Sequence, residues 1–120
     1  MKILVADDSR VMRSIVIRTL RQAGYGDADV VQAGDGHEAL GMIRDEDPDL
    51  VLCDWNMPGL TGLELLVQIR AGGDARPFGF VTAQQSPQMR QTAIASGAQF
   101  LIAKPFTADD FRDALDSVEA

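Results

Sequence analysis

The chain has 120 residues, 46% of them hydrophobic, and its 11 basic residues against 18 acidic ones give a net charge of -7. This length and composition suit one domain with a hydrophobic core, and the negative charge argues against unaided binding to nucleic acid or to an anionic membrane. No apolar run is long enough for a membrane span or a signal peptide. We therefore expect one cytoplasmic, monomeric domain over residues 1–120, whose partners are proteins and cations.

Five short apolar runs are predicted as strands, at residues 3–6, 29–33, 50–53, 78–82 and 100–103. Segments with helical spacing of apolar residues lie around them, at about 10–23, 36–46, 61–71, 87–96 and 107–118. Strands that alternate with helices and are apolar on both faces indicate a parallel sheet covered on both sides, an α/β three-layer sandwich. The single cysteine, Cys53, ends the third run and is expected to be a core residue.

The residues at the ends of these runs are unusually polar. Asp7 and Asp8 follow the first run, Asp54 follows the third, Thr82 ends the fourth and Lys104 follows the fifth. Ligand sites in parallel sheets lie at the carboxyl ends of the strands, so we expect these residues to converge. Carboxylates at a partly solvated edge suit Mg²⁺, and a metal with a lysine around one carboxylate can hold a phosphoryl group during its transfer. The pattern thus predicts Asp54 as a nucleophile.

Each of these residues alone also has a simpler interpretation. Asp7 and Asp8, placed before a helix, could be only helix caps, and Thr82 could be an ordinary β-branched strand residue. Lys104 could extend to solvent, and Pro105 could simply stop the strand or could form a cis bond that turns the lysine over the sheet. It is their shared position at one edge of the sheet that favours a functional site.

The segments VADDS, CDWNMPGLTGLELL, VTA and AKPFT, in this order, resemble the motifs of response regulator receiver domains, most closely the chemotaxis members. The resemblance covers essentially the whole chain. It implies a flavodoxin-like (βα)5 fold with strand order 2-1-3-4-5, an order taken from the family and not from composition or spacing. It also implies that a histidine kinase, a histidine phosphotransfer protein or a small phosphodonor supplies a phosphoryl group. Such a domain catalyses only its own phosphorylation and dephosphorylation.

The resemblance implies a role for each polar residue at the strand ends. Asp54 matches the phosphoacceptor, and Asp8 and Asp54 match carboxylate ligands of Mg²⁺. The backbone carbonyl of Asn56 would be a third protein ligand, and Asp7 would act on the metal through water. Lys104 matches the lysine that contacts the phosphoryl oxygens.

The switch from site to target is also implied by the resemblance, with one departure. Thr82 matches the hydroxyl that moves toward the phosphoryl group, and the small Ala83 leaves the pocket open. The family usually has Tyr or Phe three residues before the lysine, where this chain has Leu101. Phe100 cannot replace the ring, because a shift of one residue points a strand side chain to the opposite face. The implied target would bind the face formed by the fourth helix, fifth strand and fifth helix.

Two amides could set the lifetime of the phosphorylated state. Asn56 lies two residues after the acceptor and Gln84 two residues after Thr82, and both can hydrogen-bond a water. We expect them to favour a short-lived phosphorylated state, as polar residues at these positions do in the family. The alternative is that both amides are merely solvated at the rim.

The first helix carries a basic outer face. Arg13, Arg18 and Arg21 could only solvate the helix, but the resemblance implies that this helix docks the histidine-bearing partner, and we favour that role. Gly79, in the middle of a predicted strand, is expected to mark a bulge or a close approach of another group.

Three other kinds of protein are less well supported by the sequence. An aspartyl-phosphate phosphatase has its nucleophile after the first strand and a second Asp two residues later, whereas Asp54 follows the third strand and position 56 is Asn. A binding module that has lost phosphorylation would lack some of the acidic or lysine residues, and a flavin-binding protein would have a phosphate loop after the first strand. With no output domain in the chain we expect a single-domain regulator, although a receiver excised from a longer regulator would look the same.

Overall fold

The computed structural model describes residues 1–83 and 86–119, which contain one five-stranded parallel sheet in the order β2-β1-β3-β4-β5. The strands are β1 (Lys2–Ala6), β2 (Asp29–Ala33), β3 (Leu50–Cys53), β4 (Phe78–Thr82) and β5 (Phe100–Ala103). All five coincide closely with the predicted strands, and the order is the one implied by the resemblance. The apolar runs are thus explained by burial on both faces of a parallel sheet.

The helices follow the predicted pattern, with small differences at their ends. They are α1 (Arg10–Leu20), the π-helical turn η1 (Arg21–Tyr25), α2 (Gly36–Glu46), α3 (Gly62–Ala71), α4 (Pro87–Ala95) and α5 (Ala108–Glu119). The first α-helix ends at Leu20, three residues earlier than predicted. The π-helical turn η1 follows it directly, and Gly24 within this turn has a φ of 102°. Within the residues that the structure describes, no helix is both long and apolar enough to cross a bilayer.

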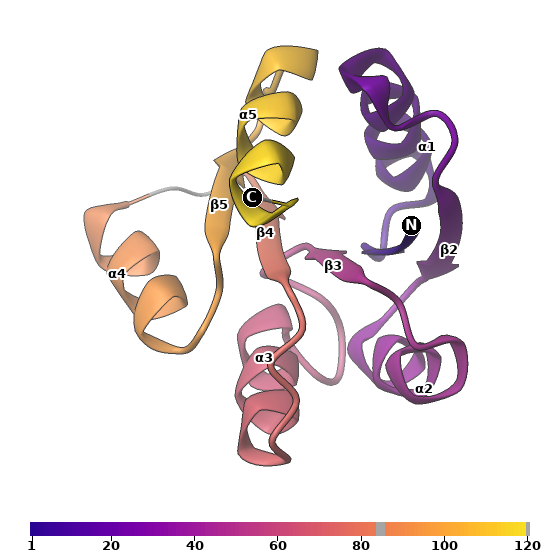
Figure 1. The fold of residues 1–120 in the computed structure, drawn as a ribbon. Helices are drawn as coiled ribbons and strands as arrows, with labels where there is room; N and C mark the ends of the chain where they lie inside the picture. Colours follow the sequence, from indigo (N-terminus) through magenta and orange to yellow (C-terminus); the bar gives the residue numbers. More distant parts are fainter. Residues whose placement is uncertain (84–85, 120) are drawn as a thin grey trace.

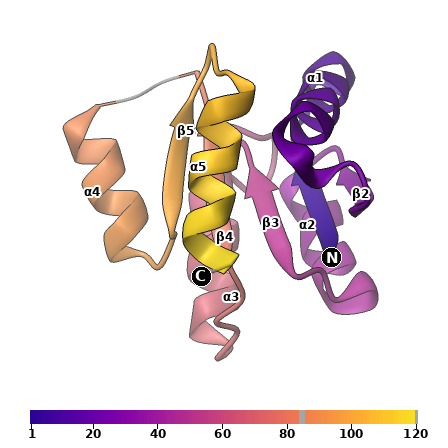
Figure 2. The same ribbon diagram turned by 45° about the horizontal axis from the view of Figure 1, so that its top comes forward.

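The helices form two layers around the sheet (Figures 1 and 2). One face packs on α1 and α5, through a cluster in which Val16 of α1 and Phe111 of α5 meet strand residues such as Val5. The other face packs on α2, α3 and α4, through a cluster that includes Leu66 and Ala93. The result is the three-layer sandwich that the sequence predicts.

Gly79 marks a close approach and not a bulge. Its pairing with Leu52 on β3 and with Phe100 on β5 is uninterrupted, but a Cβ added at Gly79 would lie 2.0 Å from the Phe100 ring. The ring thus occupies the space of the missing side chain. Phe100 belongs to the cluster on the α1 and α5 face, whereas Leu101 belongs to the opposite cluster, so the ring of Phe100 does not stand in for an aromatic residue at position 101.

Candidate functional site

Backbone hydrogen bonds of the sheet place three of the polar residues at one edge. Each of them lies just beyond the end of its own strand, and its amide N–H donates to the last carbonyl of a neighbouring strand. The distances are 3.1 Å from Asp7 to β2, 2.9 Å from Asp54 to β1 and 2.8 Å from Lys104 to Thr82 on β4. The positions of these side chains are therefore set by the sheet itself, which is the most rigid part of such a fold.

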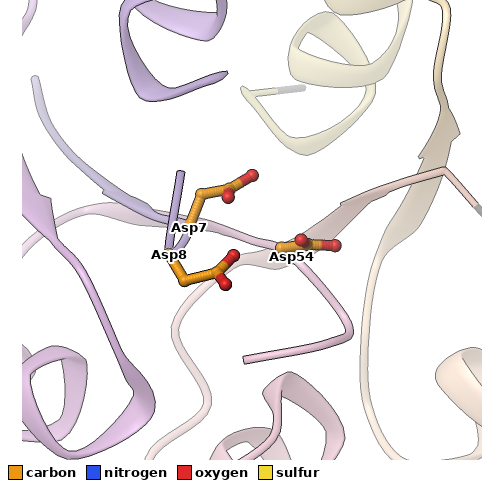
Figure 3. A group of neighbouring side chains, drawn as sticks. All are labelled: Asp7, Asp8 and Asp54. Carbon is orange, nitrogen blue, oxygen red and sulfur yellow. The ribbon is translucent and has the colours of Figure 1, made fainter. Parts of the chain in front are cut away.

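The carboxylates of Asp7, Asp8 and Asp54 form a cluster at this edge (Figure 3). One oxygen from each lies within 4.8 Å of the others; Asp7 is buried, Asp54 is half-buried and Asp8 is exposed. The Lys104 ammonium lies 3.3 Å from an Asp7 oxygen and 3.7 Å from an Asp54 oxygen. Residues from the ends of three strands thus share one small volume, as the sequence predicts.

The electrostatic environment of Asp54 disfavours its charge. Burial raises the pKa of its carboxyl above the usual 3.8, and nearby Asp7 raises it further. Lys104 and the backbone N–H groups of Trp55 and Asn56 lower the pKa, but not enough to reverse the effect of burial. The positive charge and hydrogen-bond donors around Asp54 therefore do not fully compensate the negative charge of its ionised carboxylate.

A hard divalent cation fits this shortage of positive charge. The cluster offers only oxygen ligands, and exposed Asp8 leaves one side open to water, which suits Mg²⁺ because this ion keeps several waters. An ion between the three carboxylates would offset their repulsion. Asp7, Asp8 and Asp54 are thus the side chains that could hold the metal.

The neighbours of Asp54 differ in character. Cys53 is fully buried, and burial raises the pKa of its thiol, with a further increase from Asp54 and Asp7. A buried, protonated thiol is a poor nucleophile, so the prediction of a core cysteine is confirmed. Trp55 is half-buried, with its ring 4.7 Å from that of Phe80. Its fluorescence can therefore report changes at the cluster.

The remaining predicted site residues differ in how far they are exposed to solvent. Thr82 is buried, Ala83 and Asn56 are exposed, and Gln84 lies outside the described residues. The peptide bond between Lys104 and Pro105 is cis, which is one of the two alternatives that the sequence left open for Pro105.

Arg13 has a different position from the one expected. Its guanidinium donates to the Asp7 carbonyl at 2.7 Å and to the side chain of Gln32 at 3.0 Å, while Arg18 and Arg21 are exposed. Nothing in the helical spacing distinguishes Arg13 from the other arginines, because its partners lie on other elements. Of the three arginines, only Arg18 on α1 and Arg21 at the start of η1 are thus exposed.

Replacing Asp54 with Asn is expected to stabilise the metal-free protein at neutral pH. The pKa of Asp54 is higher in the folded than in the unfolded chain, so the ionised carboxylate destabilises the fold above the folded pKa. This penalty disappears as the pH falls through that value toward 3.8. Thermal unfolding in a metal chelator should show a Tm for Asp54→Asn a few degrees above wild type at pH 7, and a smaller difference at acidic pH. The exposed control Asp45→Asn should change little, and a lower Tm for Asp54→Asn at pH 7 would contradict the prediction.

Comparisons with known proteins agree with this geometry. The family model described as the response regulator receiver domain matches residues 3–116. The chain is 39% identical over 120 residues to the chemotaxis protein CheY-3 of Vibrio cholerae, covering 98% of this chain and 91% of that protein. It is also 40% identical over 110 residues to the response regulator MprA of Mycobacterium avium, covering 92% of this chain and 47% of that protein.

The same relationship holds in three dimensions. The solved structure of chemotaxis protein CheY4 of Vibrio cholerae matches with a TM-score of 0.84 and 34% identity, covering 98% of this chain and 97% of that one. Homology to these chemotaxis proteins is consistent with a phosphorylation-activated signalling receiver. The chain belongs to the family of response regulator receiver domains.

Proposed function

We propose that this domain is a chemotaxis-type signalling receiver in which Asp54 accepts a phosphoryl group with the help of Mg²⁺. The observation that carries the proposal is the convergence of Asp54 with two other carboxylates, within 4.8 Å, and with the Lys104 ammonium at 3.7 Å. A histidine kinase or a histidine phosphotransfer protein would supply the phosphoryl group. The domain would act in the cytoplasm as a monomer over residues 1–120, and it would catalyse only its own phosphorylation and dephosphorylation.

The transfer requires an ionised Asp54. Its oxygen forms a bond to phosphorus while the bond from phosphorus to the donor's histidine nitrogen breaks, and the electron pair of that bond leaves with the donor. The Lys104 ammonium lies 3.7 Å from an Asp54 oxygen and 3.3 Å from an Asp7 oxygen, so it would contact the transferred oxygens while it remains paired with Asp7. Water later cleaves the aspartyl phosphate, which returns the carboxylate and inorganic phosphate.

The metal would be held by Asp8 and Asp54 directly, by the backbone carbonyl of Asn56, and by Asp7 through water. When bound, Mg²⁺ would neutralise charge on the phosphoryl oxygens and on the three carboxylates. The donor set supports this assignment, since all the side chains are oxygen ligands and the cluster has too little positive charge of its own. One ion would thus join the residues that follow β1 to those that follow β3.

The signal would leave through the face formed by α4, β5 and α5. Thr82 would move toward the phosphoryl group, with Ala83 leaving room beside it, and its carbonyl accepts a hydrogen bond from the amide of Lys104, just beyond β5. A groove of about 490 Å³ opens on this face; it is lined by Arg90, Leu101, Ile102, Ala103, Pro105, Asp110, Asp113 and Ala114. Leu101 occupies the position where the family usually has an aromatic residue, so no ring can rotate there. The response would instead be a change in the packing of Leu101 in this groove.

The helix α4 is well suited to respond, because little holds it in place. It has one buried residue, Ala93, whereas α3 has four, and Arg90 of α4 donates to the Leu101 carbonyl at 3.3 Å. Elements with few buried contacts move at the lowest cost in free energy. Asn56 and Gln84 would shorten the lifetime of the active state by orienting the hydrolytic water.

Incubation with Mg²⁺ and a small acyl phosphate, followed by intact mass measurement, tests the proposal. The wild type should gain the mass of one phosphoryl group, and Asp54→Ala should gain none. Asp113→Ala, which removes an exposed carboxylate of α5, is the matched control and should be labelled like the wild type. An adduct that persists in Asp54→Ala would refute the assignment of the acceptor.

A second candidate is a receiver that belongs to a longer regulator. The match to MprA, of which this chain covers 47%, favours it, whereas the chemotaxis relatives are covered almost completely. The two candidates share the same phosphorylation chemistry and differ in the target. Sequencing of the source gene beyond codon 120 separates them, since a DNA-binding region there would favour the longer regulator.

A further inference from the structure

Arg13 ties the loop that carries Asp7 and Asp8 to the neighbouring strand. Its Nη1 atom donates to the Asp7 carbonyl oxygen at 2.7 Å, and its Nε atom donates to the Gln32 side chain at 3.0 Å. Gly34 lies beside this guanidinium, and a Cβ added there would make an ordinary contact of 3.6 Å with Nη1. One side chain of α1 thus bridges the carboxyl ends of β1 and β2.

The carbonyl that accepts from Arg13 belongs to the peptide unit that joins Asp7 to Asp8. Asp7 has other restraints: its Oδ1 accepts from the Ser9 amide at 2.9 Å, and its Oδ2 lies 3.3 Å from the Lys104 ammonium. The exposed Asp8 carboxylate takes part in none of the hydrogen bonds found among the described residues. The direction of Asp8 therefore depends on its backbone, and Arg13 fixes the peptide plane that precedes it.

We propose that Arg13 is a positioning residue for divalent-cation binding, which holds Asp8 toward Asp54 through the Asp7 carbonyl. This inference rests on the proposed function, because it assumes that the carboxylate cluster binds Mg²⁺. The guanidinium suits the task, since its planar group of donors can bond a carbonyl and an amide at the same time. Groups that orient metal ligands in this way typically change metal affinity by about 10- to 100-fold when they are lost.

The sign of the effect distinguishes positioning from simple charge. A positive guanidinium beside a cation site repels the cation, so removal of the charge alone would strengthen Mg²⁺ binding. Loss of a positioning group weakens it. The exposed Arg18 lies on the same helix and measures the effect of charge without the bonds to Asp7 and Gln32.

The test is a titration of the purified domain with MgCl2, followed by the fluorescence of its single tryptophan, Trp55. We expect Arg13→Gln to raise the Kd for Mg²⁺ about tenfold and Arg18→Gln to leave it unchanged or lower it slightly. Arg13→Lys keeps the charge but lacks the planar set of donors, so it should also bind weakly. Gln32→Ala, which removes the second anchor of Arg13, should raise the Kd by a smaller factor. Thermal unfolding of each variant confirms that the titration is made on folded protein.

The outcomes separate this inference from the proposed function. A wild-type Kd in both Arg13→Gln and Gln32→Ala, or tighter binding by Arg13→Gln, would overturn the positioning role. Full recovery in Arg13→Lys would also overturn it, because the planar guanidinium that bonds both Asp7 and Gln32 would then not be required. If the wild type itself shows no response to Mg²⁺ by fluorescence or by a shift in Tm, the proposed function fails instead. Should Arg13→Gln be unfolded, Arg13→Lys and Gln32→Ala decide the matter.

Discussion

Replacing Lys104 with Ala should slow phosphorylation by a small acyl phosphate about a hundredfold or more. The ammonium lies 3.7 Å from Asp54 and 3.3 Å from Asp7, where it can neutralise charge that develops during transfer. Loss of one preorganised group of this kind typically costs about 10²- to 10³-fold in rate. Lys104 also lowers the pKa of Asp54, so its removal would raise that pKa further. The initial rate of mass gain at saturating Mg²⁺ measures the effect.

Lys2 is the matched control for this experiment. It is the other lysine of the chain and lies at the opposite end of β1, 3.9 Å from Asp29 and 4.0 Å from Glu46. Lys2→Ala should therefore phosphorylate at the wild-type rate. Lys104→Arg retains a positive charge and should keep more activity than Lys104→Ala. A Lys104→Ala variant that reacts as fast as Lys2→Ala would show that the ammonium has no part in the transfer.

Replacing Gly62 with Ala should destabilise the fold and impair the acceptor together. A Cβ at Gly62 would lie 2.1 Å from the Asp54 carbonyl oxygen and 3.1 Å from the Phe80 ring. The first of these is a backbone atom of the proposed acceptor, so relief of the clash must shift the Asp54 backbone or the start of α3 that lies against it. Overpacking of this kind costs about 3 kcal/mol at the upper end of its usual range. Urea denaturation measures the loss of stability, and the rate of acyl-phosphate labelling at low temperature measures the displacement of Asp54.

Gly72 provides the control at the other end of the same helix. It has a φ of -81°, and an added Cβ would lie 3.5 Å from its nearest neighbour, an ordinary contact. Gly72→Ala should therefore have a stability close to that of the wild type and a normal rate of labelling. If Gly62→Ala were as stable and as reactive as Gly72→Ala, the close approach to Asp54 would not be what requires a glycine at position 62.

The outline of the site could be read from the sequence because it depends on local patterns. Apolar runs of four residues are followed by Asp54 and by Lys104, and parallel strands bring their carboxyl ends to one edge of the sheet. The observed amide bonds from these residues to neighbouring strands express the same rule. Arg13 was predicted only as a docking residue, because the bond from its side chain to Gln32 crosses from α1 to β2.

Gly79 is a residue whose role a local sequence pattern predicts only in part. Its rarity in a strand indicated a bulge or a close approach, but the choice depended on Phe100, which is 21 positions later in the chain and pairs with it across the sheet. The strand order 2-1-3-4-5 likewise came from the family resemblance, since the apolar runs are compatible with several orders. The role of Gly79 and the order of the strands depend on contacts between distant segments of the chain, and the spacing of apolar residues does not predict these contacts.

Local sequence patterns were sufficient to predict the five strands, the approximate helices, the polar strand ends and Asp54 as the nucleophile, because apolar periodicity and strand polarity are local properties. The tertiary structure alone decided three further matters: the bridge from Arg13 to the Asp7 carbonyl, the contact of Gly62 with the Asp54 backbone, and the raised pKa of Asp54. The reason is the same in each case. Burial and bonding at the cluster depend on residues brought together from separate strands and helices.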